Sequence, residues 1–220
     1  RGFFTSRVIG TFMGEAAAML GEGVPAPSIE QAALQAGYPT GPLALFDEVS
    51  LTLARRIREA SREAAAAEGW DFPEHPSYPV IDTMVVEFDR GGRAAGAGFY
   101  DYADGKRVGL WSGLAENWGS DIDPKDVDLN ELQERMLFVE AIDSVRCFDE
   151  GVLRNVPDAN IGSIFGIGFP PWTGGVLQYI NGYGLPEFVA RAQELAAKFG
   201  DRFEPPASLV ARAQSGEQYV

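Results

Sequence analysis

Apolar residues recur every three or four positions near the start of the chain, with charged and small residues between them. This spacing places one apolar stripe along one face of a helix. The stripe consists of Ile9, Met13, Ala17 and Leu20. The pattern therefore predicts a long helix that starts at Arg7 and ends near Gly23.

Two further helices are predicted by their start and stop signals. Ser28, with Gln31 three residues later, forms a capping-box pattern, so we expect a short helix from Ser28 to Gly37. The prolines and glycine of residues 38–42 then require a turn. An Ala/Arg/Glu-rich stretch predicts helix from Leu43 to Glu68, with a break around residues 49–52 where β-branched and hydroxyl residues cluster.

The middle of the chain is less regular. Three prolines predict irregular backbone over residues 70–79, followed by a short helix over residues 80–88. Asp104-Gly105 between aromatic and β-branched residues predicts a small hairpin. Residues 118–128 are acidic and contain a proline, which is typical of a linker, and Asp128 marks the start of another helix.

That later helix repeats the first one. Arg7, the apolar stripe and Glu22-Gly23 recur at a constant offset of 128 positions, for instance Ile9 at Leu137. Glu15 and Asp143 obey the same offset, and either carboxylate could orient a neighbouring arginine. We therefore predict an all-α fold of two duplicated helical units, residues 1–118 and 119–220, packed together with a small irregular or hairpin segment between them.

Charge and composition exclude several classes of function. The net charge of -14 disfavours nucleic acids and anionic membrane surfaces, and no apolar run is long enough to cross a bilayer. The lone Cys147 lies in an apolar helical register, as expected of a buried thiol in a reducing cytoplasm. His75 is the single histidine, expected in an exposed loop, so neither a metal site nor a Cys/His or Ser/His nucleophile has its usual parts.

Four motifs carry a family resemblance. They are Gly2-Phe3-Phe4-Thr5-Ser6-Arg7, Glu22-Gly23, Gly37-Tyr38-Pro39-Thr40-Gly41-Pro42, and the segment from Gly91-Gly92-Arg93 to Gly98-Phe99-Tyr100-Asp101-Tyr102. In order and spacing they resemble the C-terminal domain of 3-hydroxyacyl-CoA dehydrogenases. The second half, with Gly166-Ile167-Gly168-Phe169-Pro170-Pro171, resembles the duplicated domain of multifunctional β-oxidation proteins and trifunctional-type α-subunits.

The resemblance implies NAD-dependent oxidation of a (3S)-3-hydroxyacyl-CoA to the 3-ketoacyl-CoA in fatty-acid β-oxidation. In that family the catalytic His and Glu and the NAD site belong to a preceding domain, and this chain starts at Arg1 without Met, so we expect a longer parent protein. We therefore expect no catalytic residue, cofactor site or metal here, and no turnover by the chain alone. Gly162, Gly166 and Gly168 do not replace the NAD site, because Pro170-Pro171 follows where a dinucleotide fingerprint needs a helix.

The resemblance carries two residues over as acyl-CoA contacts. Ser6 stands where the family usually has an Asn that can hydrogen-bond the substrate, and a helix N-cap is the competing interpretation. Phe165 stands where bacterial relatives place a Tyr, and packing in the core is the favoured alternative. Trp172 is expected either to line the acyl channel or, preferably, to pack between helices. Asp47 and Glu48 are expected on a solvated helix face.

A local basic cluster could contact the anionic coenzyme A, although a solvated basic loop is the favoured interpretation. Its members are Arg90, Arg93, Lys106 and Arg107. The competing function is a helical interaction module without activity that binds a partner such as a thiolase subunit. The resemblance also allows a homo-oligomer. A Rossmann domain encoded upstream of Arg1 would favour the enzyme over the module.

Overall fold

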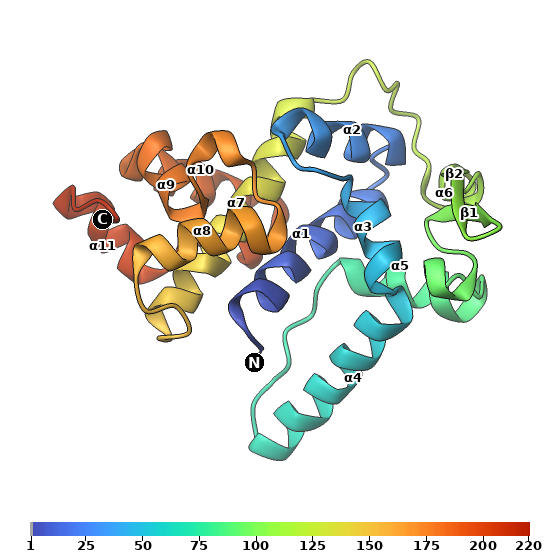
Figure 1. The fold of residues 1–220 in the computed structure, drawn as a ribbon, viewed down its shortest axis with the longest axis horizontal. Coiled ribbons are helices and arrows are strands. Elements are labelled where there is room, and N and C mark those ends of the chain that lie inside the picture. Colours follow the sequence, from blue (N-terminus) through green and yellow to red (C-terminus); the bar gives the residue numbers. More distant parts are fainter. Residues whose placement is uncertain (1) are drawn as a thin grey trace. The chain divides into compact units, whose positions relative to one another are not determined.

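The computed structural model describes residues 2–220 and is all-α, as predicted (Figure 1). The helices are joined mostly by short loops. They are α1 (Phe4–Gly21), α2 (Ala26–Ala36), α3 (Pro42–Val49), α4 (Leu51–Glu68), α5 (Ser77–Asp82), α6 (Gly113–Trp118), α7 (Leu129–Asp149), α8 (Val156–Ile167), α9 (Val176–Tyr183), α10 (Leu185–Phe199) and α11 (Ala207–Ser215). One π-helical and three 3-10 segments complete the set, at Thr83–Glu87, Arg93–Ala95, Pro171–Thr173 and Asp201–Phe203.

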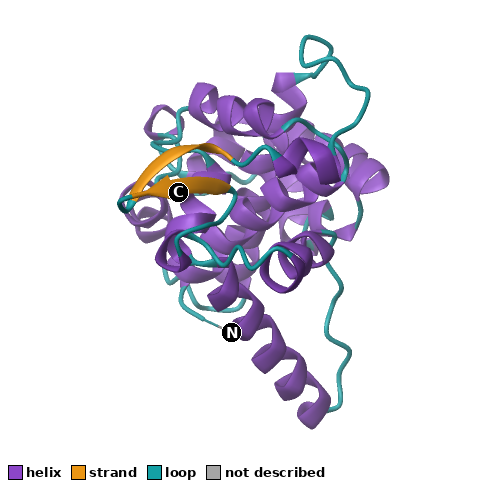
Figure 2. Ribbon diagram, turned by 90° about the vertical axis from the view of Figure 1, so that its right-hand side faces the viewer, coloured by secondary structure: helices purple, strands orange, loops and turns teal. Residues whose placement is uncertain are grey.

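The predicted hairpin is present and is the one sheet in the described residues (Figure 2). Strand β1 (Tyr100–Ala103) runs antiparallel to β2 (Lys106–Leu110), with Ala103 opposite Lys106 at the turn. Asp104 and Gly105 both have positive φ, 51° and 72°. An Asp-Gly pair tolerates this conformation, which matches the twist of the two strands.

The local stop signals of the long helical stretch are confirmed. Ser50, with φ 87°, separates α3 from α4, and its hydroxyl accepts a hydrogen bond from Leu53 N at 3.3 Å. Gly69 ends α4 in the left-handed conformation, where a glycine has no steric penalty. Pro42 begins α3, because its missing amide hydrogen is not needed in the first helical turn.

Three predicted helix starts are wrong by a few residues. Helix α1 begins at Phe4, not Arg7, and α2 begins at Ala26, two residues before the predicted cap. Ser28 is therefore a buried residue inside α2, and Pro25 O accepts from its amide at 2.9 Å. Pro27 did not delay the helix, because proline is tolerated in a first turn. The helix predicted from residue 80 begins at Ser77 and continues as the π-helical segment.

The described chain forms two compact units, neither of which is one continuous stretch. Unit 1 contains residues 2–12, 33–39 and 130–220, and unit 2 contains residues 13–32 and 40–129. The core of unit 1 is aromatic: the Phe138 and Phe188 rings are stacked with their centroids 4.1 Å apart. In unit 2 the fully buried Leu43 and Leu51 lie in the core. The predicted boundary between residues 118 and 119 stays a prediction.

Candidate functional site

Ser6 lies in the first turn of α1 and is exposed. Its hydroxyl donates to Phe3 O at 3.1 Å. An N-cap would stand before the first helical residue and accept from a helix amide. Since α1 begins at Phe4, Ser6 is inside the helix and the N-cap interpretation is wrong. The hydroxyl can exchange its local bond for one to a ligand.

Helix α8 approaches this turn through two glycines. A Cβ added to Gly162 would lie 3.3 Å from the Phe4 ring, and one added to Gly166 would lie 2.7 Å from Thr5 Cγ2. The close approach therefore requires a glycine at position 166, whereas at position 162 a larger residue would make a tight contact with the Phe4 ring. Thr5 precedes Ser6 and Gly166 follows Phe165, so this contact is made by residues adjacent in sequence to the two predicted site residues.

Phe165 is 85% exposed, so the expectation that it packs in the core is wrong. It lies four residues after Ile161, itself 58% exposed, and side chains spaced by four share a helix face. Phe3 is also 85% exposed. We call Ile161 and Phe165, which share one face of α8, the apolar face. Exposed apolar side chains that gather in this way mark a surface for a ligand or another protein part.

Trp172 is anchored to the protein but largely exposed, and its role in lining an acyl channel stays a prediction. Its indole Nε1 donates to Ala36 O at 2.7 Å, and its ring lies against Gly37, where an added Cβ would be 3.1 Å away. The side chain nevertheless remains 68% exposed. One edge of the ring is thus anchored to the loop after α2 while much of it stays accessible.

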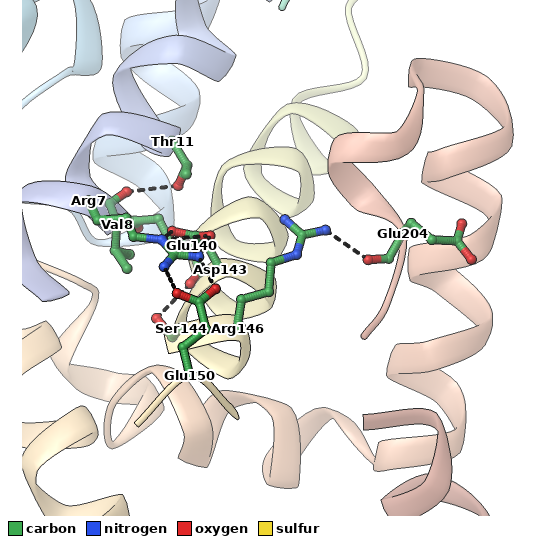
Figure 3. A network of polar contacts seen from close by, with 9 residues as sticks. All are labelled: Arg7, Val8, Thr11, Glu140, Asp143, Ser144, Arg146, Glu150 and Glu204. Atoms are coloured by element: carbon green, nitrogen blue, oxygen red, sulfur yellow. Dashed lines mark hydrogen bonds and ion pairs between the residues drawn. The ribbon is translucent and has the colours of Figure 1, made fainter. Parts of the chain in front are cut away.

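An ion-pair network fixes the start of α1 on α7 (Figure 3). The Arg7 guanidinium donates to Asp143 Oδ1 at 3.0 Å through Nη2 and to Glu150 Oε2 at 2.6 Å through Nη1. The hydrogen bond to Glu150 raises the pKa of Arg7, and it lowers the pKa of Glu150. The prediction that Asp143 orients an arginine is confirmed. Arg7 thereby holds the helical turn that carries Ser6.

A buried carboxyl lies one turn before Asp143. Tyr38 donates to Glu140 Oε2 at 2.6 Å, and the Tyr38 ring stacks on Phe12 with centroids 4.3 Å apart. Burial raises the pKa of Glu140 to about 8. Glu140 Oε1 has no hydrogen-bond partner within the described chain. Sequence reasoning missed this pair, although a glutamate inside the apolar run from Met136 to Ala141 was the available signal.

In unit 2, Asp47 is buried, so the expected solvated position is wrong. Its carboxylate accepts from Phe99 N at 2.8 Å, Tyr100 N at 2.9 Å and the Tyr102 hydroxyl at 3.0 Å. Burial raises its pKa. A Cβ on Gly98 would lie 2.0 Å from Asp47 Oδ1, so the glycine makes room for the carboxylate. The Gly-Phe-Tyr-Asp-Tyr motif therefore attaches the hairpin to α3.

The basic cluster is engaged within unit 2. Arg90 donates to Asp101 Oδ1 and to Gly98 O, both at 2.6 Å, and Arg93 donates to Glu48 Oε1 at 2.9 Å. Arg107 lies 4.9 Å from the Tyr100 ring centroid. Two of the four charges thus already have acidic partners.

His75 and Cys147 have structural surroundings. His75 is half-buried rather than exposed, and its Nδ1 lies 2.8 Å from Ser77 Oγ. Cys147 is buried as predicted, which raises its pKa to about 11. Residues 2–220 contain no cluster of His, Cys, Asp and Glu that could hold a metal. Within the same residues, no helix is both long and apolar enough to span a bilayer.

Comparison with known proteins supports the resemblance. Residues 2–102 match the model of the 3-hydroxyacyl-CoA dehydrogenase C-terminal domain. The chain is 33% identical over 218 residues to the fatty acid oxidation complex subunit alpha of Vibrio parahaemolyticus, and 34% identical to that of Vibrio vulnificus. Each match covers 99% of this chain, which spans 30% of the length of either relative.

Two crystal structures share the fold. The first, 3-hydroxybutyryl-CoA dehydrogenase from Escherichia coli, has a TM-score of 0.69 at 20% identity, covering 99% of this chain and 61% of the other. The second, the dehydrogenase part of multifunctional enzyme 1 from C. elegans, has a TM-score of 0.60 at 15% identity, covering 94% and 47%. The resemblance inferred from the motifs is thereby confirmed: residues 2–102 match the family of 3-hydroxyacyl-CoA dehydrogenase C-terminal domains, and the rest of the chain is similar to the same relatives.

Proposed function

We propose that the chain is the substrate-side helical portion of an NAD-dependent (3S)-3-hydroxyacyl-CoA dehydrogenase in fatty-acid β-oxidation. The family match over residues 2–102 carries this proposal. The names of the Vibrio relatives support the metabolic context. Acyl-CoA is the proposed substrate and the cytoplasm the proposed location.

The residues described do not fit NAD. A dinucleotide site needs parallel strands with a glycine-rich turn leading into a helix, whereas the sheet of the described chain is one antiparallel hairpin. Gly162 and Gly166 face Phe4 and Thr5, and a Cβ on Gly168 would lie 2.8 Å from Pro39. These glycines accommodate protein contacts. We therefore place NAD and the catalytic base on a domain outside this chain.

Ser6 is the proposed polar contact with the substrate. In the proposed oxidation a base takes the proton of the 3-hydroxyl group, the hydride of the same carbon would pass to NAD bound on the other domain, and the carbon–oxygen bond becomes a carbonyl. A donor aimed at this oxygen orients it throughout. The Ser6 hydroxyl is exposed, and within residues 2–220 it donates to Phe3 O. Arg7 restricts movement of the turn through its bonds to Asp143 and Glu150.

Phe165 is the proposed apolar contact. A phenyl ring lacks the hydroxyl of tyrosine, so it offers burial of acyl carbon atoms and no hydrogen bond. Its exposure of 85% leaves the ring available for this burial. Ile161 extends the same apolar face.

Replacement of Ser6 by alanine in the full-length enzyme tests the polar contact. Loss of one hydrogen bond, about 0.5 to 1.5 kcal/mol, lowers kcat/KM for a 3-hydroxyacyl-CoA by about 2- to 13-fold. Ser215→Ala is the matched control, because Ser215 is also exposed and its hydroxyl donates to Arg212 O, three residues back, at 3.2 Å. Equal kinetics in the two variants would remove Ser6 from the site.

The purified 220-residue chain tests whether NAD binding and catalysis require another domain. We expect it to bind no NAD in titration calorimetry and to give no NADH-dependent reduction of acetoacetyl-CoA. The full-length enzyme is the positive control. Measurable reduction by the chain alone would contradict the placement of the cofactor on another domain.

A second candidate function is a helical interaction module that holds a partner such as a thiolase subunit. The observation that favours it is the name of the relatives, which are subunits of a complex. The two candidates differ in the parent reading frame: an upstream Rossmann domain supports the dehydrogenase. Co-purification of a thiolase with a parent protein that lacks such a domain would support the module.

A further inference from the structure

One side of α4 is held by the segment that follows it. The residues of α4 that are buried, Leu51, Arg58 and Ala65, are spaced by seven and so share one side of the helix. Arg58 forms an ion pair with Asp82 and lies 4.8 Å from the Tyr78 ring centroid. Arg62 reaches Glu74 at 2.6 Å. Residues 70–82 therefore cover this side of α4 (Figure 1).

The opposite side of α4 carries an exposed apolar stripe. Its members are Leu53, Ile57, Ala60, Ala64 and Ala67, with spacings of four, three, four and three. Leu53 is 46% exposed and Ile57 57%. Ala60 and Ala67 are exposed and Ala64 is half-buried. This alternation is the spacing of a coiled-coil seam, in which apolar positions repeat every 3.5 residues. We call these five residues the α4 seam.

We propose that the α4 seam packs against the α4 seam of a second copy of the chain, with the two helices antiparallel. In an isologous pair, every contact occurs twice. One register matches large side chains with small ones: Leu53 meets Ala64 of the second copy, and Ile57 meets Ala60. The alanines let the two helices approach closely while the branched side chains fill the space between them.

Charges beside the seam select this arrangement. Arg56 and Glu63 are both exposed, and each precedes a seam residue, Ile57 and Ala64 respectively. In the antiparallel register Arg56 faces Glu63 of the second copy, twice by symmetry. In a parallel pair, Glu63 would instead face Glu68, and like charges repel. An antiparallel register shifted by one heptad would place Glu63 against Glu63 of the second copy. Charge and shape therefore favour the same pairing.

The seam is short, so the association is weak. From Leu53 to Ala67 the helix rises about 21 Å at about 1.5 Å per residue. An interface of this length falls in the range of transient contacts. The pairing is independent of the proposed enzymatic role, and a covalent trap is the suitable probe.

Two cysteine variants of the full chain, Leu53→Cys and Ala64→Cys, trap the pair when they are mixed and oxidised, with an affinity tag on one of them. We expect a disulfide between the tagged and untagged chains. Neither variant alone should cross-link, because two copies of one position lie about 16 Å apart along the helix axis and a disulfide needs Cα atoms within about 7 Å. Native Cys147 is buried and gives no background.

The opposite pattern would overturn the proposal. Cross-links within each single variant would show a parallel pair, and absence of any cross-link would show that the seam does not pair with itself. Circular dichroism of each variant establishes that it is folded.

Charge reversal supplies a second measurement on the same pair. Arg56→Glu or Glu63→Arg, present in both cysteine chains, should slow cross-linking about fivefold, since exposed ion pairs contribute modestly and two are replaced by repulsion. Arg56→Glu combined with Glu63→Arg should restore the original rate. If the combined variant is as slow as the single ones, the predicted pairing of Arg56 with Glu63 is wrong.

Discussion

Replacing Glu140 with glutamine should make the protein more stable at alkaline pH. Burial raises the pKa of Glu140 from its ordinary value of 4.5 to about 8. Between these pH values the folded state keeps a proton that the unfolded chain has lost. Raising the pH through this window therefore destabilises the folded state, and the loss is complete above pH 8. Glutamine keeps an acceptor for Tyr38 and carries no charge.

The magnitude follows from the two pKa values. Each pH unit between them changes the free energy of unfolding by about 1.4 kcal/mol. The advantage of Glu140→Gln should grow from near zero at pH 4.5 to about 3 kcal/mol at pH 7 and about 4 to 5 kcal/mol at pH 8. Such a difference is a large part of the typical total of about 5 to 15 kcal/mol.

Urea unfolding at pH 5, 6, 7, 8 and 9, followed by circular dichroism, measures this difference. At each pH the free energy of unfolding of the unsubstituted protein is subtracted from that of the variant, so that the contributions of all other titrating groups cancel. Glu116→Gln, which changes an exposed glutamate on α6, is the matched control for removal of one negative charge. A Glu140→Gln difference that is constant between pH 5 and 9 would refute the assignment of a protonated carboxyl to this site.

Two further predictions concern the framework around the candidate site. Asp47→Ala leaves the amides of Phe99 and Tyr100 without their acceptor, so urea unfolding should show a loss of about 2 to 4 kcal/mol, while Glu48→Ala, which removes only an exposed ion pair, should cost less than about 1 kcal/mol. Gly175→Ala should lower the free energy of unfolding by more than about 2 kcal/mol, and with it the melting temperature, because φ is 111° and the added Cβ would lie 2.4 Å from Asn160 Cα. Gly182→Ala in α9 should instead stabilise the protein by about 0.5 to 1 kcal/mol, since an added Cβ would meet no atom within 4 Å beyond its chain neighbours and the backbone of its own helix, and alanine is the better helix former. Equal melting temperatures for the two glycine variants would contradict this account.

Features with local causes were predicted well from the sequence. The end of α4 at Gly69 and the hairpin turn at Asp104-Gly105 depend on backbone conformations that few residues tolerate. The apolar spacing of α1 identified the helix but not its start at Phe4. The predicted start of α2 was also wrong. The capping-box pattern placed it at Ser28, but Pro27 fits the first turn of a helix that begins earlier.

Features with distant causes were missed or misjudged. Tyr38 and Glu140 are 102 residues apart, and no local pattern joins them. Asp47 was expected in solvent because its role depends on the hairpin, more than 50 residues later. Phe165 was expected in the core because a phenylalanine is usually buried, yet the glycine contacts of α8 are made by other residues of that helix. The family motifs supplied Ser6 and Phe165, and their roles stay predictions.

The discontinuous make-up of unit 1 has a consequence for biosynthesis. Arg7 emerges from the ribosome 136 residues before its acceptor Asp143. Phe12 and Tyr38 likewise precede the whole of residues 130–220, the segment that completes their unit. During translation the apolar side chains of the N-terminal turns therefore stay exposed to solvent until residues 130–220 have been synthesised. Exposed apolar side chains make a nascent chain prone to aggregation. Closing so long a loop also slows folding. We therefore expect chaperones to bind the first forty residues during translation, before α11 is synthesised.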